Sequence, residues 1–369
     1  RYWEWLFKME NEIRTKIPMV YLNIWDDMPA PMYNESYYES CDTLLAISKQ
    51  TENINRIVLG DKAKDKLIAY VPHGINEEVF RPIKEGDQHW DDFLNTKKKL
   101  FGGKEYEHIF FFNSRNIRRK CISDLFVAFK LFKDQLPEDK KDKVALLLHT
   151  QPVDDNGTDL FAVRDMLLGE DPNILFSTER ISTESMNVLY NLADVTVLPS
   201  SNEGWGLALT ESMMAGTMII ANVTGGMQDQ MRFEDENGDW IKFDENFCSN
   251  HFGTYKKCGK WALPVFPSNT SVVGSPKTPY IFDDRLDFRD LADALMQSYK
   301  MSKEEKVERG LAGREWVTSD ESMASARMMN KNVIKYLNQT IDNFKPRNNF
   351  EFIKIDKLRV KQLQHKLIY

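Results

Sequence analysis

The sequence predicts an α/β protein of two domains, each built on a parallel sheet that helices cover on both faces. Three observations predict this class. The chain has 369 residues, which exceeds one ordinary hydrophobic core. Short apolar runs alternate with amphipathic helical stretches through most of the sequence, as in doubly wound sheets. Residues 193–226 read as strand, glycine-rich loop, helix, strand and glycine-rich loop, a unit that binds ligands where its strands end.

The composition is that of a soluble globular protein, with 42% hydrophobic and 28% charged residues. The net charge of −7 argues against nucleic acid as a partner. No apolar run approaches the ~20 residues of a membrane span, so any membrane contact is expected to be peripheral. Four cysteines in a chain this long do not form a secreted disulfide framework, which favours the cytoplasm.

Cys248, His251 and Cys258 lie close together in the sequence and could be considered as metal ligands. No fourth ligand follows at zinc-site spacing, so we expect no metal.

The first part of the chain contains three strand candidates, at residues 18–24, 42–48 and 66–71. Ser48 is placed to cap a helix over residues 49–59. The sequence opens without Met, and no glycine-rich turn precedes the first strand candidate. We therefore expect the amino-terminal domain to lack its first strand–helix units.

The second part starts with the apolar strand candidate 108–113 and continues the alternation of strands and helices. Further strands are expected at 144–149, 173–177 and 238–243, and further helices at 122–136, 159–168, 183–192, 288–299, 302–317 and 321–341. Residues 84–107 are polar and charged, which is typical of a linker. Residues 246–287 are aromatic and rich in Gly and Pro, which indicates an insertion.

These features divide the chain into residues 1–100, an amino-terminal domain with its linker, and 104–318, a second domain with the insertion 246–287. The remainder, 319–369, is expected to hold a helix and a basic tail. From residue 346 onward the tail carries six Lys or Arg against two acids. It either touches anionic lipid or is a solvated helix.

The most informative stretch places Glu203 and Glu211 with seven residues between them. Gly-Trp-Gly-Leu follows the first glutamate and Ala-Gly-Thr follows shortly after the second. The two glycines beside Trp205 let backbone amides approach a ligand, and the helix amino terminus after them favours an anion. Isolated glutamates on a helix are mostly solvated, but a strand on each side argues for a site here.

This stretch resembles the signature of retaining glycosyltransferases with the GT-B fold, in particular the family-four (glycosyl transferases group 1) enzymes. The resemblance implies two Rossmann-like domains, a nucleotide-diphosphate sugar as donor, and a glycan, lipid or small molecule as acceptor. It implies no cofactor and no metal. A helix near the carboxyl end is then expected to cross back to the first domain.

The resemblance also implies roles for individual residues. Glu211 would accept hydrogen bonds from the nucleotide ribose, and Glu203 would bind sugar hydroxyls near the transferred carbon. The donor is held by the Gly-Trp-Gly-Leu stretch, whose members are Gly204, Trp205, Gly206 and Leu207. Phe176 to Ile181 is where the family places the nucleotide base.

A basic loop follows the strand 108–113. Arg115 and Lys120 match the spacing of the two cations with which the family holds the donor diphosphate, while Ser114 and Cys121 replace the usual glycines. A guanidinium binds phosphate oxygens at two points and Lys adds a compact charge. Arg118 and Arg119 are weaker candidates, and a simply solvated basic loop is the alternative.

Two further assignments rest on the resemblance. Gly74 lies in a segment, Pro72 to Pro82, that is similar to the one joining the family's two halves, although an ordinary turn is the alternative. Many relatives place a His near the reacting carbon, and here Asp26 or Asp27 takes that place. The predicted function is a retaining glycosyltransferase in polysaccharide, glycolipid or glycoconjugate synthesis. The alternatives are a catalytically inactive nucleotide-sugar-binding module and, within the same fold, an epimerase or phosphorylase.

Overall fold

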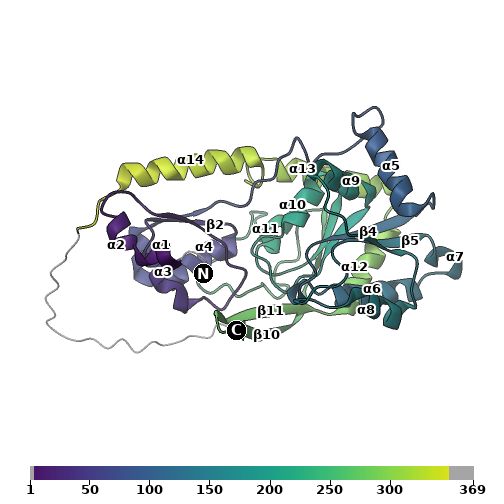
Figure 1. Cartoon of the computed structure of the whole chain (residues 1–369), viewed down its shortest axis with the longest axis horizontal. Coiled ribbons are helices and arrows are strands. Elements are labelled where there is room, and N and C mark those ends of the chain that lie inside the picture. The colour runs from purple at the N-terminus through teal and green to yellow at the C-terminus, as the bar shows by residue number, and fades with distance from the viewer. Residues whose placement is uncertain (1–3, 349–369) are drawn as a thin grey trace.

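The computed structural model describes residues 4–348 and shows two α/β domains side by side (Figure 1). The first domain holds a three-stranded parallel sheet in the order β1-β2-β3. Its strands are β1 Val20–Asn23, β2 Thr43–Ala46 and β3 Leu67–Tyr70. All four residues of β2 are buried, because this central strand is covered on both faces.

The predicted helix after β2 is present as α4, Lys49–Leu59. The Ser48 hydroxyl accepts a hydrogen bond from the backbone N–H of Thr51 at 3.0 Å, so it caps the helix as expected. Three short helices, α1 Glu4–Lys8, α2 Glu10–Ile13 and α3 Glu35–Glu39, complete the described part of this domain.

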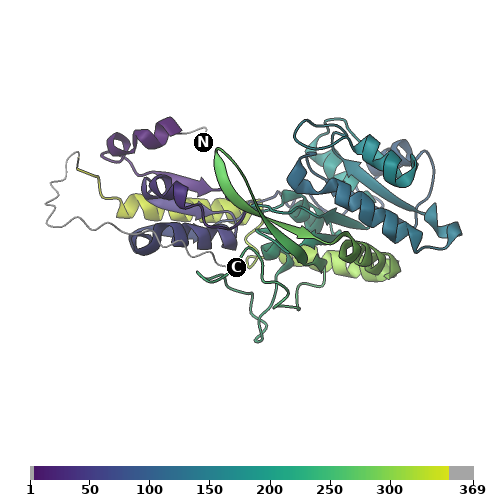
Figure 2. The same ribbon diagram turned by 90° about the horizontal axis from the view of Figure 1, so that it is seen from below.

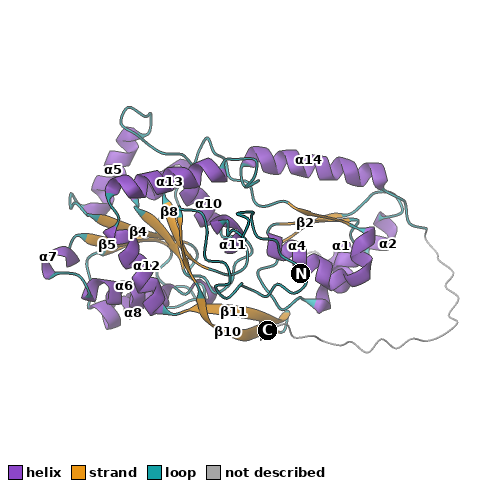
Figure 3. Ribbon diagram, turned by 180° about the vertical axis from the view of Figure 1, so that it is seen from behind, coloured by secondary structure: helices purple, strands orange, loops and turns teal. Residues whose placement is uncertain are grey.

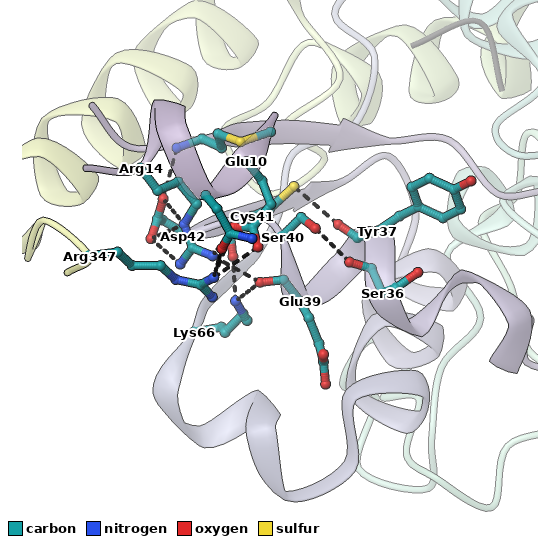
Figure 4. A network of polar contacts seen from close by, with 12 residues as sticks. Glu10, Arg14, Ser36, Tyr37, Glu39, Ser40, Cys41, Asp42, Lys66 and Arg347 are labelled. Carbon is teal, nitrogen blue, oxygen red and sulfur yellow. Dashed lines mark hydrogen bonds and ion pairs between the residues drawn. The ribbon is translucent and has the colours of Figure 1, made fainter. Parts of the chain in front are cut away.

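The start of the chain is fastened to the first sheet by a polar network (Figure 4). Arg14 forms an ion pair with Asp42 at 2.7 Å and another with Glu10 at 3.1 Å. Asp42 also accepts a hydrogen bond from the backbone N–H of Met19 at 2.8 Å. Arg347, beyond the last described helix, pairs with Glu10 at 2.9 Å, so segments from both ends of the described chain meet here.

The second domain holds a six-stranded parallel sheet in the order β6-β5-β4-β7-β8-β9. Its strands are β4 His108–Asn113, β5 Val144–His149, β6 Ile174–Ser177, β7 Val195–Leu198, β8 Met218–Asn222 and β9 Ala262–Val265. From β4 the following strands, β5 and β6, are added on one side, and from β7 the following strands, β8 and β9, are added on the other side. The strand order therefore reverses between β4 and β7, which is where open α/β sheets bind ligands.

Helices cover both faces of this sheet (Figure 3). They are α6 Ile122–Asp134, α7 Glu138–Lys141, α8 Leu160–Leu168, α9 Thr183–Leu192, α10 Leu207–Met214, α11 Met227–Met231, α12 Phe288–Lys300 and α13 Lys303–Val317. On one face of the sheet, Phe110 of β4 packs against two phenylalanines of α6, and it meets Phe132 edge to face at 5.2 Å.

Three stretches differ from the sequence-based expectations. The linker contains a helix, α5 Trp90–Phe101, whose only buried residue is Phe101. Residues 238–243 form no strand, because Ile241 bonds back to Phe233 and the sheet edge is taken by β9. That edge strand lies inside the stretch 246–287, which therefore supplies part of the sheet as well as an excursion from it.

The excursion is an antiparallel hairpin of β10 Pro267–Ser275 and β11 Thr278–Leu286. Figure 2 shows it reaching from the second domain to the first. Phe282 of this hairpin joins the hydrophobic cluster of the first domain. Its backbone N–H donates to the carbonyl of Met28 at 2.6 Å.

The helix α14, Ala326–Asn343, runs along the first domain on another side (Figure 1). Met329, Val333 and Tyr336 pack against residues of β2 and of the β3 region. Residues 349–369, which hold most of the basic tail, lie outside the described part of the chain. Among residues 4–348, no helix is both long enough and apolar enough to cross a membrane.

Candidate functional site

A cavity of about 390 Å³ lies between the two domains, at the ends of β4 and β7. The second domain contributes charged side chains and the backbone of the glycine-rich loop, while the first contributes a more apolar wall. The lining residues of the first domain are Ile24, Asp26, Ile47 and His73. Those of the second are Asn113, Ser114, Arg119, Lys120, Leu198, Glu203, Gly204, Trp205, Gly206, Leu207, Ala208 and Glu211.

Glu203 lies in the loop after β7 and is only 5% exposed. Its carboxylate forms ion pairs with Lys120 and, at 3.0 Å, with Arg119. Burial by itself raises the pKa of Glu203, but the two cations outweigh it and the net pKa lies below the ordinary value. Glu203 is therefore ionised in this setting, and it holds both cations at the cavity.

The turn that carries the cations is tight. Arg118–Lys120 form a single 3₁₀ turn, and Cys121 after it adopts a left-handed conformation with φ of 52°. This is the position where the resemblance expects Gly, since only Gly adopts such angles without steric cost. The turn directs the Lys120 side chain inward, where burial lowers its pKa.

Glu211 lies on α10 and also lines the cavity. Burial raises the pKa of its carboxyl to about 7, and a hydrogen bond from the Tyr190 hydroxyl at 2.6 Å opposes that shift. Glu203 and Glu211 thus differ in their electrostatic surroundings. The first is neutralised by cations, whereas the second is held by a neutral phenol.

The glycine-rich loop requires its glycines for two reasons. Gly206 has φ of 88°, which a side chain rarely allows. A Cβ at Gly204 would lie 2.8 Å from Cδ1 of Ile47, so this residue permits the close approach of the first domain. Trp205 turns its indole into the core, where Nε1 donates to Thr210 at 2.9 Å, and leaves its backbone to the cavity. Leu207 begins α10 and is partly exposed.

Arg115 does not line the cavity. Its side chain is largely exposed and pairs with Asp154 at 2.8 Å, on the loop after β5. The guanidinium at the cavity belongs to Arg119, which also donates to the carbonyl of Asn202 at 2.6 Å. The only sequence signal for Arg119 is its charge directly before Lys120.

The two aspartates after β1, Asp26 and Asp27, lie in different surroundings. Asp26 lines the cavity, with its Oδ2 at 3.9 Å from Nε of Arg119, and burial raises its pKa against the opposing charge of Arg119. Asp27 is fully buried away from the cavity, where its Oδ2 lies 2.6 Å from the hydroxyl oxygen of Thr224 and its Oδ1 accepts a hydrogen bond from the backbone N–H of Met28 at 2.8 Å.

Gly74 also lies outside the cavity lining. A Cβ there would be 2.6 Å from Cβ of Met329 and 2.7 Å from the carbonyl oxygen of Ser325, so this glycine lets the segment pack against the start of α14. Its neighbour His73 lines the cavity instead, and burial lowers the pKa of its imidazole. His73 has no motif of its own, and sequence reasoning missed it. The described residues contain no group of three His, Cys, Asp or Glu side chains arranged to hold a metal ion.

Part of the chain is similar in sequence to known glycosyltransferases. Residues 95–246 match the family described as "Glycosyl transferases group 1". An uncharacterized glycosyltransferase of Methanocaldococcus jannaschii is 25% identical over 242 residues, which cover 64% of this chain and 55% of that protein. The chain thus spans about half the length of that curated relative.

Solved structures show the same fold. Sucrose-phosphate synthase of Thermosynechococcus elongatus aligns with a TM-score of 0.57 and 21% identity, covering 84% of this chain and 60% of that one. HepE of Anabaena, solved in complex with UDP and glucose, aligns with a TM-score of 0.61 and 13% identity, covering 88% and 72%. The chain therefore has the GT-B fold, and residues 95–246, which make up much of its second domain, are similar to the glycosyl transferases group 1 family.

Proposed function

We propose that this chain transfers a sugar from a nucleotide-diphosphate donor to an acceptor hydroxyl, with retention of the anomeric configuration. One observation carries the proposal. One cavity at the sheet's reversal point is lined both by Glu203 with its two cations and by Glu211. The complexes of HepE with UDP and with UDP-glucose support a nucleotide sugar as donor.

In this proposal the second domain holds the donor. Glu211 accepts hydrogen bonds from the ribose, and Glu203 accepts them from hydroxyls of the transferred sugar. Backbone amides at the start of α10 contact the sugar and phosphate, where the helix amino terminus favours negative charge. Lys120 and Arg119 stabilise the charge that grows on the leaving diphosphate, and no resident cofactor takes part.

The chemical step exchanges one bond to the anomeric carbon for another. The acceptor oxygen forms its bond to that carbon on the face from which the diphosphate departs. The carbon–oxygen bond to the diphosphate breaks, and the acceptor proton passes to the leaving phosphate. Asp26 and His73 of the first domain line the same cavity. In this proposal they contact the acceptor.

The first test is binding and turnover of the wild-type protein. Calorimetric titration with UDP, ADP and GDP identifies the preferred nucleotide, and incubation with the matching sugar nucleotide measures hydrolysis or transfer. Binding with turnover supports the proposal. Binding without turnover supports the inactive module, and absence of binding to all three overturns both.

The second test separates the two glutamates. Glu211→Gln is expected to weaken the nucleoside diphosphate itself, because an amide presents one acceptor oxygen and no charge. Glu203→Gln is expected to leave that affinity nearly intact while lowering transfer. Lys130→Ala, an exposed lysine on α6, serves as a control. The reverse pattern, with nucleotide binding lost only in Glu203→Gln, contradicts these roles.

A further inference from the structure

Three side chains from three elements form a directed chain of hydrogen bonds, in which Asn113 and Glu211 line the cavity and Tyr190 lies behind them. Nδ2 of Asn113, at the end of β4, donates to the hydroxyl oxygen of Tyr190 on α9 at 2.8 Å. The Tyr190 hydroxyl then donates to Oε2 of Glu211 on α10 at 2.6 Å. Since an amide nitrogen can only donate, Asn113 occupies the phenol's acceptor side and leaves its hydrogen for Glu211.

The packing around Tyr190 holds its hydroxyl in this position, so it cannot turn to another hydrogen-bond partner. Its side chain is fully buried, and its ring lies edge to face with Phe111 at 5.1 Å and with Phe80 at 6.0 Å. Burial raises the pKa of its hydroxyl well above the ordinary value, so the phenol remains a donor. Tyr190 does not line the cavity, so it reaches a ligand only through Glu211.

The hydrogen bond from Tyr190 holds one carboxylate oxygen of Glu211, Oε2, and leaves the other oxygen available to a ligand. Among the described residues, the bond from Tyr190 is the only one made to the Glu211 side chain, so Oε1 remains available toward the cavity. We propose that Tyr190 is a positioning residue for nucleotide recognition, holding the Glu211 carboxylate so that it accepts hydrogen bonds from the ribose hydroxyls. This inference rests on the proposed function and adds a residue that touches no substrate.

A positioning role has an electrostatic consequence that a packing role lacks. The Tyr190 hydroxyl stabilises the ionised form of Glu211, so its loss moves the carboxyl pKa further above about 7. Ribose binding by the ionised carboxylate then requires a higher pH. The other charged or titratable groups around α10 are Arg314 on α13, Asp229 on α11, and Asp26, His73, Arg119, Lys120 and Glu203 at the cavity. Tyr190→Phe leaves these groups in place, so comparison with the wild type isolates Glu211.

The test compares UDP with 2′-deoxy-UDP in the wild type and in Tyr190→Phe, by calorimetry from about pH 6 to about pH 9, a range that brackets the expected titration. Phenylalanine keeps the ring packing and removes only the hydroxyl. UDP affinity near neutral pH is expected to fall about tenfold, the cost of a hydrogen bond to a charged group. The penalty should be smaller for 2′-deoxy-UDP, which lacks one ribose hydroxyl. The midpoint of the pH dependence should move upward, and KM should change more than kcat.

Tyr38→Phe provides the matched control, since Tyr38 is a buried tyrosine in the core of the first domain. It is expected to leave the affinity and the pH midpoint unchanged. Where Tyr190→Phe fails to fold, Asn113→Ala tests the same chain and should show a weaker form of the same pattern. Wild-type affinity and an unshifted pH midpoint in Tyr190→Phe overturn the inference. Absence of UDP, ADP and GDP binding in the wild type overturns the proposed function instead.

Discussion

Arg115 and Arg119 lie four residues apart, and only their surroundings distinguish them. The family spacing selects Arg115, because it stands five positions before Lys120. The structure places Arg115 on the surface with Asp154 and brings Arg119 to Glu203. The sequence could not predict which of the two arginines reaches the cavity, since that depends on the position of a loop from another strand–helix unit.

The two arginines give the first prediction. Arg119→Ala is expected to raise the activation barrier by ~2–4 kcal/mol, the effect typical of removing a group that stabilises transition-state charge. Arg115→Ala, which breaks only an exposed ion pair, is expected to change turnover little. Steady-state rates with the donor identified by titration provide the measurement. A large loss in Arg115→Ala with a small one in Arg119→Ala would instead show that Arg115 leaves Asp154 to bind the diphosphate.

At the scale of elements, the sequence predicts best those strands and helices that local apolar patterns mark. The strands β4 and β5 and the helices α4 and α9 have the bounds expected from the sequence, because continuous apolar runs and capping residues delimit them. The helix α5 was missed because it buries a single residue and so lacks a clear apolar stripe. The short strand β9 could not be predicted either, because it lies in a Gly- and Pro-rich stretch and pairs with β8, which is distant in the sequence.

The same limits apply to the site. Glu203, Lys120 and Glu211 could be placed together because they follow strand ends that meet at one edge of the sheet. His73 could not, since it reaches the cavity only through the arrangement of the two domains.

The β10–β11 hairpin gives a prediction at this scale. Phe282→Ala removes a buried ring of the hairpin from the core of the first domain, and the free energy of unfolding is expected to fall by about 3–5 kcal/mol. Val272→Ala on β10, where the side chain is 61% exposed, is the control and should cost little. Chemical denaturation measures both. Equal stability of the two variants would show that the hairpin does not hold the first domain.

At the scale of the whole molecule, the two domains are joined by buried polar contacts as well as by the hairpin and α14. The backbone N–H of Lys49, at the start of α4, donates to Oδ2 of Asp229 on α11 at 2.8 Å. A carboxylate at a helix amino terminus is favourable, so this contact joins the domains through α4. A second contact joins Asp27, Thr224 and Asp284, which come from the first domain, the loop after β8 and the hairpin.

The second contact requires that one of its two carboxyls is protonated. Oγ1 of Thr224 lies 2.6 Å from Oδ2 of Asp27 and 2.8 Å from Oδ2 of Asp284, yet a hydroxyl has one hydrogen. One of the two carboxyls must therefore be protonated and donate to Thr224. Burial, followed by the charge of Asp284, raises the pKa of Asp27 well above its ordinary value, which assigns the proton to Asp27.

The last prediction follows from the sign of that shift. Below the ordinary aspartate pKa, both the folded and the unfolded chain hold the Asp27 proton, so its titration does not change the free energy of unfolding. As pH rises, the unfolded chain releases the proton while the folded chain keeps it, so the free energy of unfolding falls until the pH reaches the raised folded pKa.

Asp27→Asn removes this loss of stability, because an amide donates to Thr224 without titrating and its oxygen still accepts from Met28. Denaturant unfolding from about pH 5 to about pH 8 should show a shallower decline for Asp27→Asn than for the wild type, whereas Asp27→Ala should be destabilised throughout, since it leaves buried partners unpaired. Parallel declines for the wild type and Asp27→Asn would show that Asp27 does not hold this proton.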